Sequence, residues 1–174
     1  MEEQRAPSMV KIATKYGLIQ GVFAFLLFLV VTMTGLKQNW VSSVINIVVL
    51  VVLMILAHRE FKKTREGIMT YGQGVGSGTL LSVVASVLTC VLLFIYVNYI
   101  NPGYSAAMLK IQQTGFEQQG ITGAQLDQAM AITGAMLTPV GIVVTSLLSG
   151  VIVGFIVALI VSIFTRVNDP RAVI

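Results

Sequence analysis

Long uncharged runs separated by short clusters of charge make up most of this chain. Four runs contain no Lys, Arg, Asp or Glu: residues 16–36, 38–57, 67–109 and 128–165. A membrane-spanning helix needs about 20 mostly apolar residues. The pattern therefore predicts an all-α membrane protein whose 174 residues form one four-helix domain. We expect its transmembrane helices near 14–34, 40–57, 76–99 and 139–164, and an outer loop at 100–138.

Composition agrees with a chain that lives in lipid. Hydrophobic residues make up 56% of the sequence and charged residues only 10%, whereas soluble domains carry about 25% charged residues. This excludes an ordinary soluble domain, a disordered chain and a secreted disulfide scaffold. The single cysteine, Cys90, and the single histidine, His58, leave no pair for a disulfide or a metal site. We expect no cofactor and no bound metal.

Basic residues predict the orientation, because Lys and Arg accumulate on the cytoplasmic side of membrane proteins. One side would hold the N-terminal tail, the connection between the second and third helices, and the C-terminal tail. Those segments carry Arg5, Lys11, Lys15, Arg59, Lys62, Lys63, Arg65, Arg166 and Arg171. The other side would hold only Lys37 and Lys110. We expect a multi-pass protein of the bacterial inner membrane with both termini in the cytoplasm. The net charge of +4 then follows from topology, and no nucleic-acid partner is expected.

Small residues recur at every fourth position in three of the predicted helices. Close approach at such residues drives helix association in lipid. The predicted packing positions are Gly17 and Gly21 in the first helix, Gly78, Ser82 and Ser86 in the third, and Ser146, Gly150, Gly154 and Ala158 in the fourth. We expect them to pack against neighbouring helices.

Polar side chains within the predicted spans are few, and they admit two interpretations. Gln20, Asn46 and Ser86 could line a polar path through the membrane, because intramembrane polar residues often mark one. They could equally form hydrogen bonds between helices. The sequence favours the second, since no ionisable residue lies among them.

Two features near the predicted cytoplasmic face suggest contact with anions. The glycine-rich stretch 71–79 resembles a phosphate-cradling loop but lacks the Lys-Ser/Thr ending of a P-loop. A flexible start to the third helix, with close helix packing, is the favoured interpretation. The basic cluster between Arg59 and Arg65 could attract anionic lipid headgroups, although topology alone also accounts for it.

The predicted outer loop is too long for a simple turn. Asn101-Pro102-Gly103 predicts the end of the third helix. A short helix is expected at 105–113, closed by Gly115. A second is expected after Thr122, with Thr122 and Gln125 as a capping box. The loop should therefore form a helical hairpin.

Three short motifs resemble a known family. They are KYGLIQG at 15–21, YGQ at 71–73 and the Asn101-Pro102 pair. Together with the layout over about 12–165, they resemble the bacterial membrane family called domain of unknown function 4199. The resemblance implies four membrane helices and supplies no activity, cofactor or site residue.

These observations favour a non-enzymatic protein that packs as an accessory subunit in a membrane complex, with the bilayer and another membrane protein or a second copy as partners. The alternative is a small oligomeric carrier or channel for a neutral or lipid-like substrate. An enzyme acting on lipid-linked substrates ranks third, because only His58 and Glu60 lie where such chemistry would need them.

Overall fold

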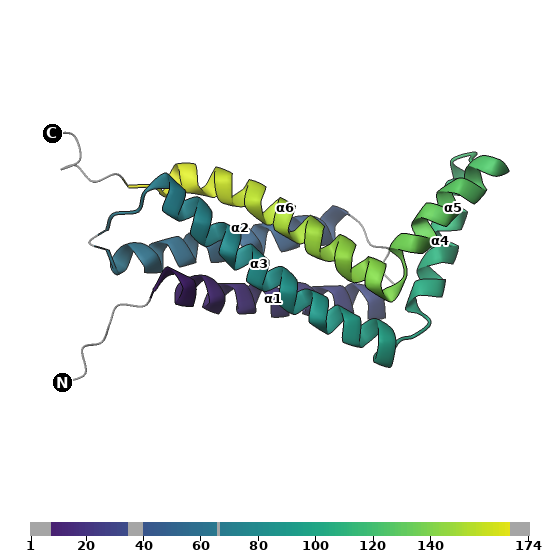
Figure 1. The fold of residues 1–174 in the computed structure, drawn as a ribbon, viewed down its shortest axis with the longest axis horizontal. Coiled ribbons are helices and arrows are strands. Elements are labelled where there is room, and N and C mark those ends of the chain that lie inside the picture. The colour runs from purple at the N-terminus through teal and green to yellow at the C-terminus, as the bar shows by residue number, and fades with distance from the viewer. Residues whose placement is uncertain (1–7, 35–39, 66, 168–174) are drawn as a thin grey trace. The chain divides into compact units, whose positions relative to one another are not determined.

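The computed structural model describes residues 8–34, 40–65 and 67–167. Within these ranges it contains six α-helices, a short π-helical segment and no strand beyond one isolated bridge (Figure 1). The helices are α1 (Met9–Met33), α2 (Trp40–Lys63), α3 (Tyr71–Ile95), α4 (Tyr104–Gln118), α5 (Ala124–Met136) and α6 (Pro139–Thr165). The π-helical segment η1 (Tyr96–Ile100) continues α3. Four helices, α1, α2, α3 with η1, and α6, are long and apolar enough to cross a membrane. The predicted all-helical fold with four spans is confirmed.

The first two spans differ from their predicted bounds at the ends that carry charge. α1 starts at Met9, earlier than the predicted 14, because Ser8 caps it by accepting a 3.4 Å hydrogen bond from the Lys11 amide. α2 continues to Lys63, beyond the predicted 57. A gap between charges marks the apolar part of a helix, whereas the helix itself can continue through polar residues. The predicted tail and loop charges Arg5, Lys37 and Arg171 lie outside the described residues.

The third span starts at Tyr71, five residues before the predicted start at 76. A reciprocal capping box explains this: the Gln73 amide donates to Thr70 Oγ1 at 3.4 Å, and the Thr70 amide donates to Gln73 Oε1 at 3.1 Å. The glycine-rich stretch 71–79 is therefore helical. The stretch is therefore neither a flexible start nor a phosphate-cradling loop, whereas the close helix packing expected with it is present at Gly74 and Gly78.

The outer segment contains the predicted helical hairpin, with different bounds. α4 runs through Gly115 to Gln118, and α5 packs against it. The predicted capping box at Thr122 is wrong, because the N-cap of α5 is Gly123 at φ +59°, without a side-chain cap. That backbone conformation suits glycine. The start of α6 matches the prediction: Thr138 Oγ1 accepts a 3.0 Å hydrogen bond from the Gly141 amide, and Pro139 takes the first helical position.

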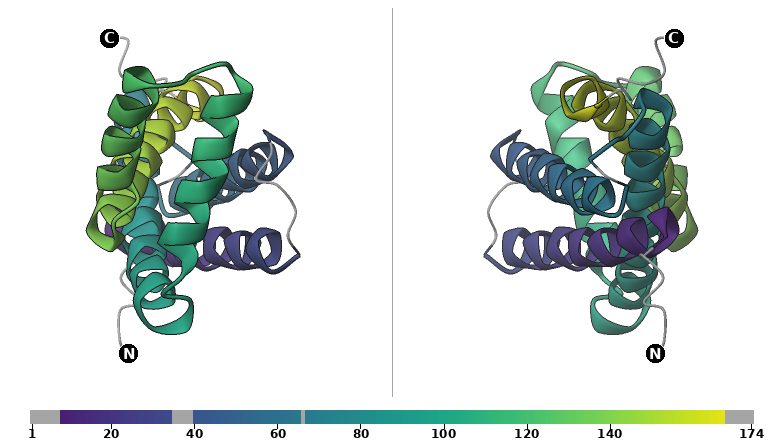
Figure 2. Two further views of the ribbon diagram at one scale, coloured as in Figure 1. Left: turned by 90° about the vertical axis from the view of Figure 1, so that its right-hand side faces the viewer. Right: turned by 90° about the vertical axis from the view of Figure 1, so that its left-hand side faces the viewer.

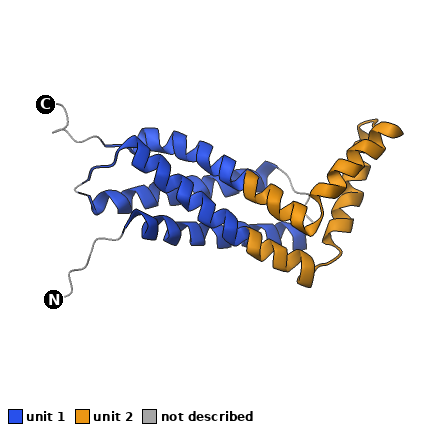
Figure 3. Ribbon diagram, viewed as in Figure 1, with its two compact units in different colours: residues 1–89, 149–174 blue, residues 90–148 orange. Residues whose placement is uncertain are grey.

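The chain divides into two compact units (Figure 3). The first comprises residues 1–89 and 149–174, and the second comprises residues 90–148. In the first unit α1, α2, most of α3 and most of α6 lie side by side (Figures 1 and 2). The second unit contains the end of α3, η1, α4, α5 and the start of α6.

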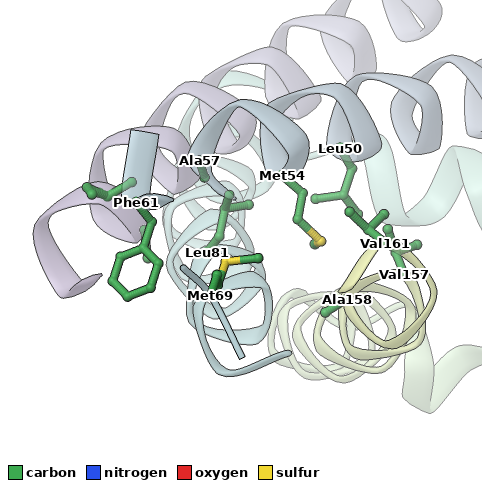
Figure 4. Packing of buried hydrophobic residues seen from close by; sticks show 11 residues of the cluster. Leu50, Met54, Ala57, Phe61, Met69, Leu81, Val157, Ala158 and Val161 are labelled. Carbon is green, nitrogen blue, oxygen red and sulfur yellow. The ribbon is translucent and has the colours of Figure 1, made fainter. Parts of the chain in front are cut away.

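The core of the first unit lies where its four helices meet. Met54 of α2, Leu81 of α3 and Ala158 of α6 are all 0% exposed. Met69, from the connection between α2 and α3, is equally buried and points into the same cluster (Figure 4). Antiparallel backbone hydrogen bonds of 3.0 and 2.9 Å join Met69 to Val167. This bridge fixes the connection to the end of α6.

The second unit is held by aromatic and polar contacts around η1. The rings of Tyr96 and Tyr104 meet edge to face at 6.1 Å, and Asn101 Nδ2 donates to the Tyr96 hydroxyl at 3.3 Å. Cys90 Sγ donates to the Val143 carbonyl at 3.4 Å. Burial raises the pKa of Tyr104, with a smaller contribution from Tyr96.

Candidate functional site

The small residues of α3 and α6 face one another along an antiparallel seam in the first unit. Each step of four residues along α3 meets a step of four back along α6: Gly74 with Ser162, Gly78 with Ala158, Ser82 with Gly154 and Ser86 with Gly150. A Cβ atom added to Gly78 would lie only 2.8 Å from the Cβ of Ala158. One added to Gly154 would overlap the side chain of Ser82. The helix backbones therefore approach as closely as these residues allow.

A different face of α3 receives α1 in the same way. A Cβ atom on Gly17 would lie 2.7 Å from the Leu81 carbonyl oxygen, and one on Gly21 would lie 2.8 Å from the Ala85 carbonyl oxygen. Thr89 Oγ1 donates to the Gly21 carbonyl at 3.2 Å. Eight of the nine predicted packing residues thus lie in the first unit, at contacts of α3 with α1 or α6. The ninth, Ser146, lies in the second unit and is half-buried.

Two of the three polar-path candidates are joined across α1 and α2. Gln20 Nε2 donates to Asn46 Oδ1 at 2.8 Å. Gln20 is 4% exposed, and its Oε1 has no hydrogen-bond partner within the described residues. Ser86 lies instead on the α3 face that meets α6, against Gly150. The structure brings Gln20 and Asn46 together, with Ser86 placed in a separate contact.

A buried polar cluster joins α2, α3 and α6 at one end of the first unit. His58 is 0% exposed, and both of its ring nitrogens have partners. Nε2 lies 3.0 Å from the Gly74 carbonyl, and Nδ1 lies 2.8 Å from the Thr165 hydroxyl. Lys62 Nζ donates to the Thr165 carbonyl at 3.1 Å. A positive charge at the last carbonyls of α6 also complements the helix dipole.

An ion pair ties α1 to α2 at this same end. Lys15 Nζ and the Tyr16 hydroxyl both donate to Glu60 Oε2, each at 2.8 Å. The side chains of Lys15 and Glu60 are 55% and 30% exposed. Water therefore screens the pair, and its contribution is orientation more than stability. The Lys15 ammonium also lies over the Tyr16 ring, 4.9 Å from its centre.

The arrangement can hold helices together through these contacts. Of the residues considered for lipid-linked chemistry, His58 contacts Gly74 and Thr165, whereas Glu60 contacts Lys15 and Tyr16. They belong to separate contacts. In the part of the chain that the structure describes, no three His, Cys, Asp or Glu side chains gather where they could hold a metal ion.

Sequence reasoning missed the partners of His58. Gly74 contributes only a carbonyl, and Thr165 lies at the edge of an apolar run, so neither carries a recognisable motif. The available signal was the position of His58 itself, a lone polar ring at the end of an apolar stretch that must find hydrogen-bond partners when buried.

Comparison with known proteins identifies the family of this chain. A family model described as "protein of unknown function (DUF4199)" matches residues 15–167. The chain belongs to the DUF4199 family. The match includes α1 from Lys15 onward, the α3–α6 seam and the His58 cluster, so these features lie within the family domain. No curated protein and no solved structure matched the chain. This DUF4199 protein is a multi-pass helical membrane protein of an uncharacterised family.

Proposed function

We propose that this DUF4199 protein is a non-enzymatic accessory subunit of a complex in the bacterial inner membrane, with both termini in the cytoplasm. The contacts at one end of the first unit support the orientation. The Lys15–Glu60 pair joins the start of α1 to the end of α2, and Lys62 joins the end of α2 to the end of α6. The basic segments are thus gathered at one end of the unit, as the positive-inside rule requires for a common cytoplasmic side.

The observation that carries the accessory role is the uneven burial of α1 and α2. Every buried residue of α1 lies between Ile12 and Gly21, and every buried residue of α2 lies between Leu50 and Phe61. The remaining half of each helix, 22–33 in α1 and 40–49 in α2, contains no buried residue. We call these two halves the distal hairpin.

Each half of the distal hairpin carries a row of exposed apolar residues. In α1, Val22, Leu26 and Val30 repeat every four residues and are 45%, 53% and 55% exposed. In α2, Val44 and Val48 are 45% and 53% exposed. Interdigitating branched side chains at helical spacing form the ridges and grooves by which helices pack. A partner helix packed along the α1 row would bury it, and this partner would be the other subunit of the complex.

Site-specific cross-linking combined with gentle-detergent purification tests the role. A photo-reactive residue at Leu26 should form one discrete cross-linked product with a stoichiometric partner. The Leu26→Trp variant should lose that partner, because a ring projecting from the α1 row keeps two helices apart. Ile163→Trp in α6, a residue 53% exposed and outside the distal hairpin, is the matched control. Retention of the same partner by Leu26→Trp would refute the proposal.

A carrier or channel is the second candidate, and one specific observation favours it. The Gln20–Asn46 pair lies within the apolar region, Gln20 is 4% exposed, and its Oε1 is without a partner among the described residues. An unpaired buried carbonyl is costly, so a transported polar solute would find a hydrogen-bonding group there. Uptake into liposomes that is lost in Asn46→Leu would favour transport over the accessory role.

A further inference from the structure

An apolar groove runs between α2 and α6 on the first unit. Its walls are Ile47, Val51 and Ile55 on α2 and Val157, Ile160 and Phe164 on α6, and its volume is about 370 Å³. Val157 also contacts the core cluster shown in Figure 4, so the floor of the groove is continuous with the packed interior. Ile160 and Phe164 are 53% and 82% exposed along its rim.

The length and the apolar lining of the groove suit a narrow apolar ligand. Ile47 and Ile55 are eight residues apart, which corresponds to about 12 Å along a helix. The apolar walls suit an extended alkyl chain of that length.

Charge is concentrated at one end of the groove. Thr165 completes the lining there, and Lys62 Nζ lies 3.1 Å from the Thr165 carbonyl oxygen. Arg166 follows Thr165 directly, and Arg59 lies one helical turn beyond Ile55 on the same stripe of α2. The nearby carboxylate of Glu60 is already engaged by Lys15 and Tyr16. The mouth of the groove is therefore cationic, and the rest of it is apolar.

We propose that the groove between α2 and α6 binds one anionic phospholipid, with an acyl chain between Ile55 and Ile160 and the phosphate beside Lys62. The apolar walls of the groove would hold the alkyl chain. The basic side chains at its mouth, near the membrane surface, would attract the anionic phosphate. This site is independent of the accessory role, since it needs no protein partner and shares only Ile47 with the distal hairpin.

Native mass spectrometry of the full chain tests the proposal. Purified protein is mixed with equal amounts of phosphatidylglycerol and phosphatidylcholine that carry the same acyl chains. We expect one phosphatidylglycerol to remain bound per chain in preference to phosphatidylcholine. Lys62→Gln should weaken that preference about fivefold, the effect of one cationic side chain at a membrane surface. Lys63→Gln removes the same charge from the neighbouring position and should leave the preference unchanged.

A second pair of variants tests the slot. Ile160→Trp fills the groove and should abolish the one-to-one lipid complex, whereas Ile163→Trp should retain it. Ile160 and Ile163 lie on the same helix and are both 53% exposed, so the pair isolates the groove. Lys62→Arg keeps the charge and should bind as the wild type does, which separates loss of charge from misfolding.

Three outcomes overturn the proposal. Equal retention of phosphatidylcholine would show that the mouth recognises no anion. Equal lipid binding by Ile160→Trp and Ile163→Trp would show that the groove is not the site. A dimer that Ile160→Trp dissociates would assign the groove to a second copy of the chain.

Discussion

Replacing Gly154 with alanine tests the α3–α6 seam with a single methyl group. The added Cβ would overlap the Cβ and Oγ of Ser82, which is 2% exposed and whose Oγ donates to the Gly78 carbonyl at 3.0 Å. Overpacking of this kind costs about 1–3 kcal/mol, whereas alanine improves helix propensity over glycine by about 1 kcal/mol. Gly76→Ala is the control, because its Cβ would meet only Met9 Cε at an ordinary 3.5 Å. We expect Gly76→Ala to stabilise the protein, and Gly154→Ala to be about 1–3 kcal/mol less stable than Gly76→Ala.

A compensating variant separates the seam from any other effect of the substitution. The Cβ on residue 154 would lie 3.6 Å from the Ser82 Cα, so only the serine side chain obstructs it. Ser82→Gly should therefore relieve the overlap, and the double variant should be more stable than the two single changes predict. We expect a coupling of about 1–3 kcal/mol in a double-mutant cycle, measured by reversible unfolding in mixed micelles. Additive effects, or equal stability of Gly154→Ala and Gly76→Ala, would refute close packing at this point.

Three further predictions concern topology, the exposed ion pair and pH. A reporter fused after Arg171 should be cytoplasmic and one inserted at Gly120 periplasmic; a periplasmic C-terminal reporter would contradict the proposed orientation. Glu60→Gln should lower the melting temperature only slightly, and the difference should shrink in high salt because the pair with Lys15 is screened; a loss that salt does not reduce would contradict a solvent-exposed pair. Burial favours the neutral form of Tyr104 in the folded state. The contribution of Tyr104 to the free energy of unfolding should therefore be present below its ordinary pKa of 10.0 and decline as the pH rises above that value. Melting curves should show the wild type losing stability relative to Tyr104→Phe in that range, and parallel curves would refute the burial argument.

The sequence was sufficient to predict the spans because lipid imposes a strong constraint. A chain must satisfy its backbone hydrogen bonds internally to cross a bilayer, so each long uncharged run has to be a helix. The ends of the helices depend on helix propensity and capping, which charge gaps do not report. Charge gaps placed the end of α2 at 57, but Lys62 and Lys63 are good helix formers. Thr70 and Gln73 form a capping box whose residues are visible in the sequence, yet the glycines beyond it suggested a flexible segment.

The candidate site was predictable in its residue types and not in its pairings. A spacing of four identifies a row of small residues on one helix, but it does not say which row meets which. Gly17 packs against the α3 face formed by Leu81 and Val84, whereas Gly154 packs against Ser82. To assign α1 to one face of α3 and α6 to another, one must know how the helices are arranged in space. The same holds for His58, whose partner Thr165 is 107 residues away in the chain.

If the His58 ring is neutral, its contacts favour a proton on Nε2. Nε2 faces the Gly74 carbonyl at 3.0 Å, and a carbonyl only accepts, so Nε2 must donate. In a neutral ring Nδ1 is then an acceptor, and the Thr165 hydroxyl at 2.8 Å must donate to it. That hydroxyl also lies 2.9 Å from the Val161 carbonyl, but its one proton cannot serve both. Because the chain has one histidine, nitrogen NMR of ring-labelled protein reports this residue alone. We expect the Nε2–H tautomer at neutral pH, with the Nδ1 signal shifting in Thr165→Val as it loses its donor. An Nδ1–H tautomer, or an imidazolium spectrum, would contradict the hydrogen-bond directions and leave the Thr165 proton with Val161.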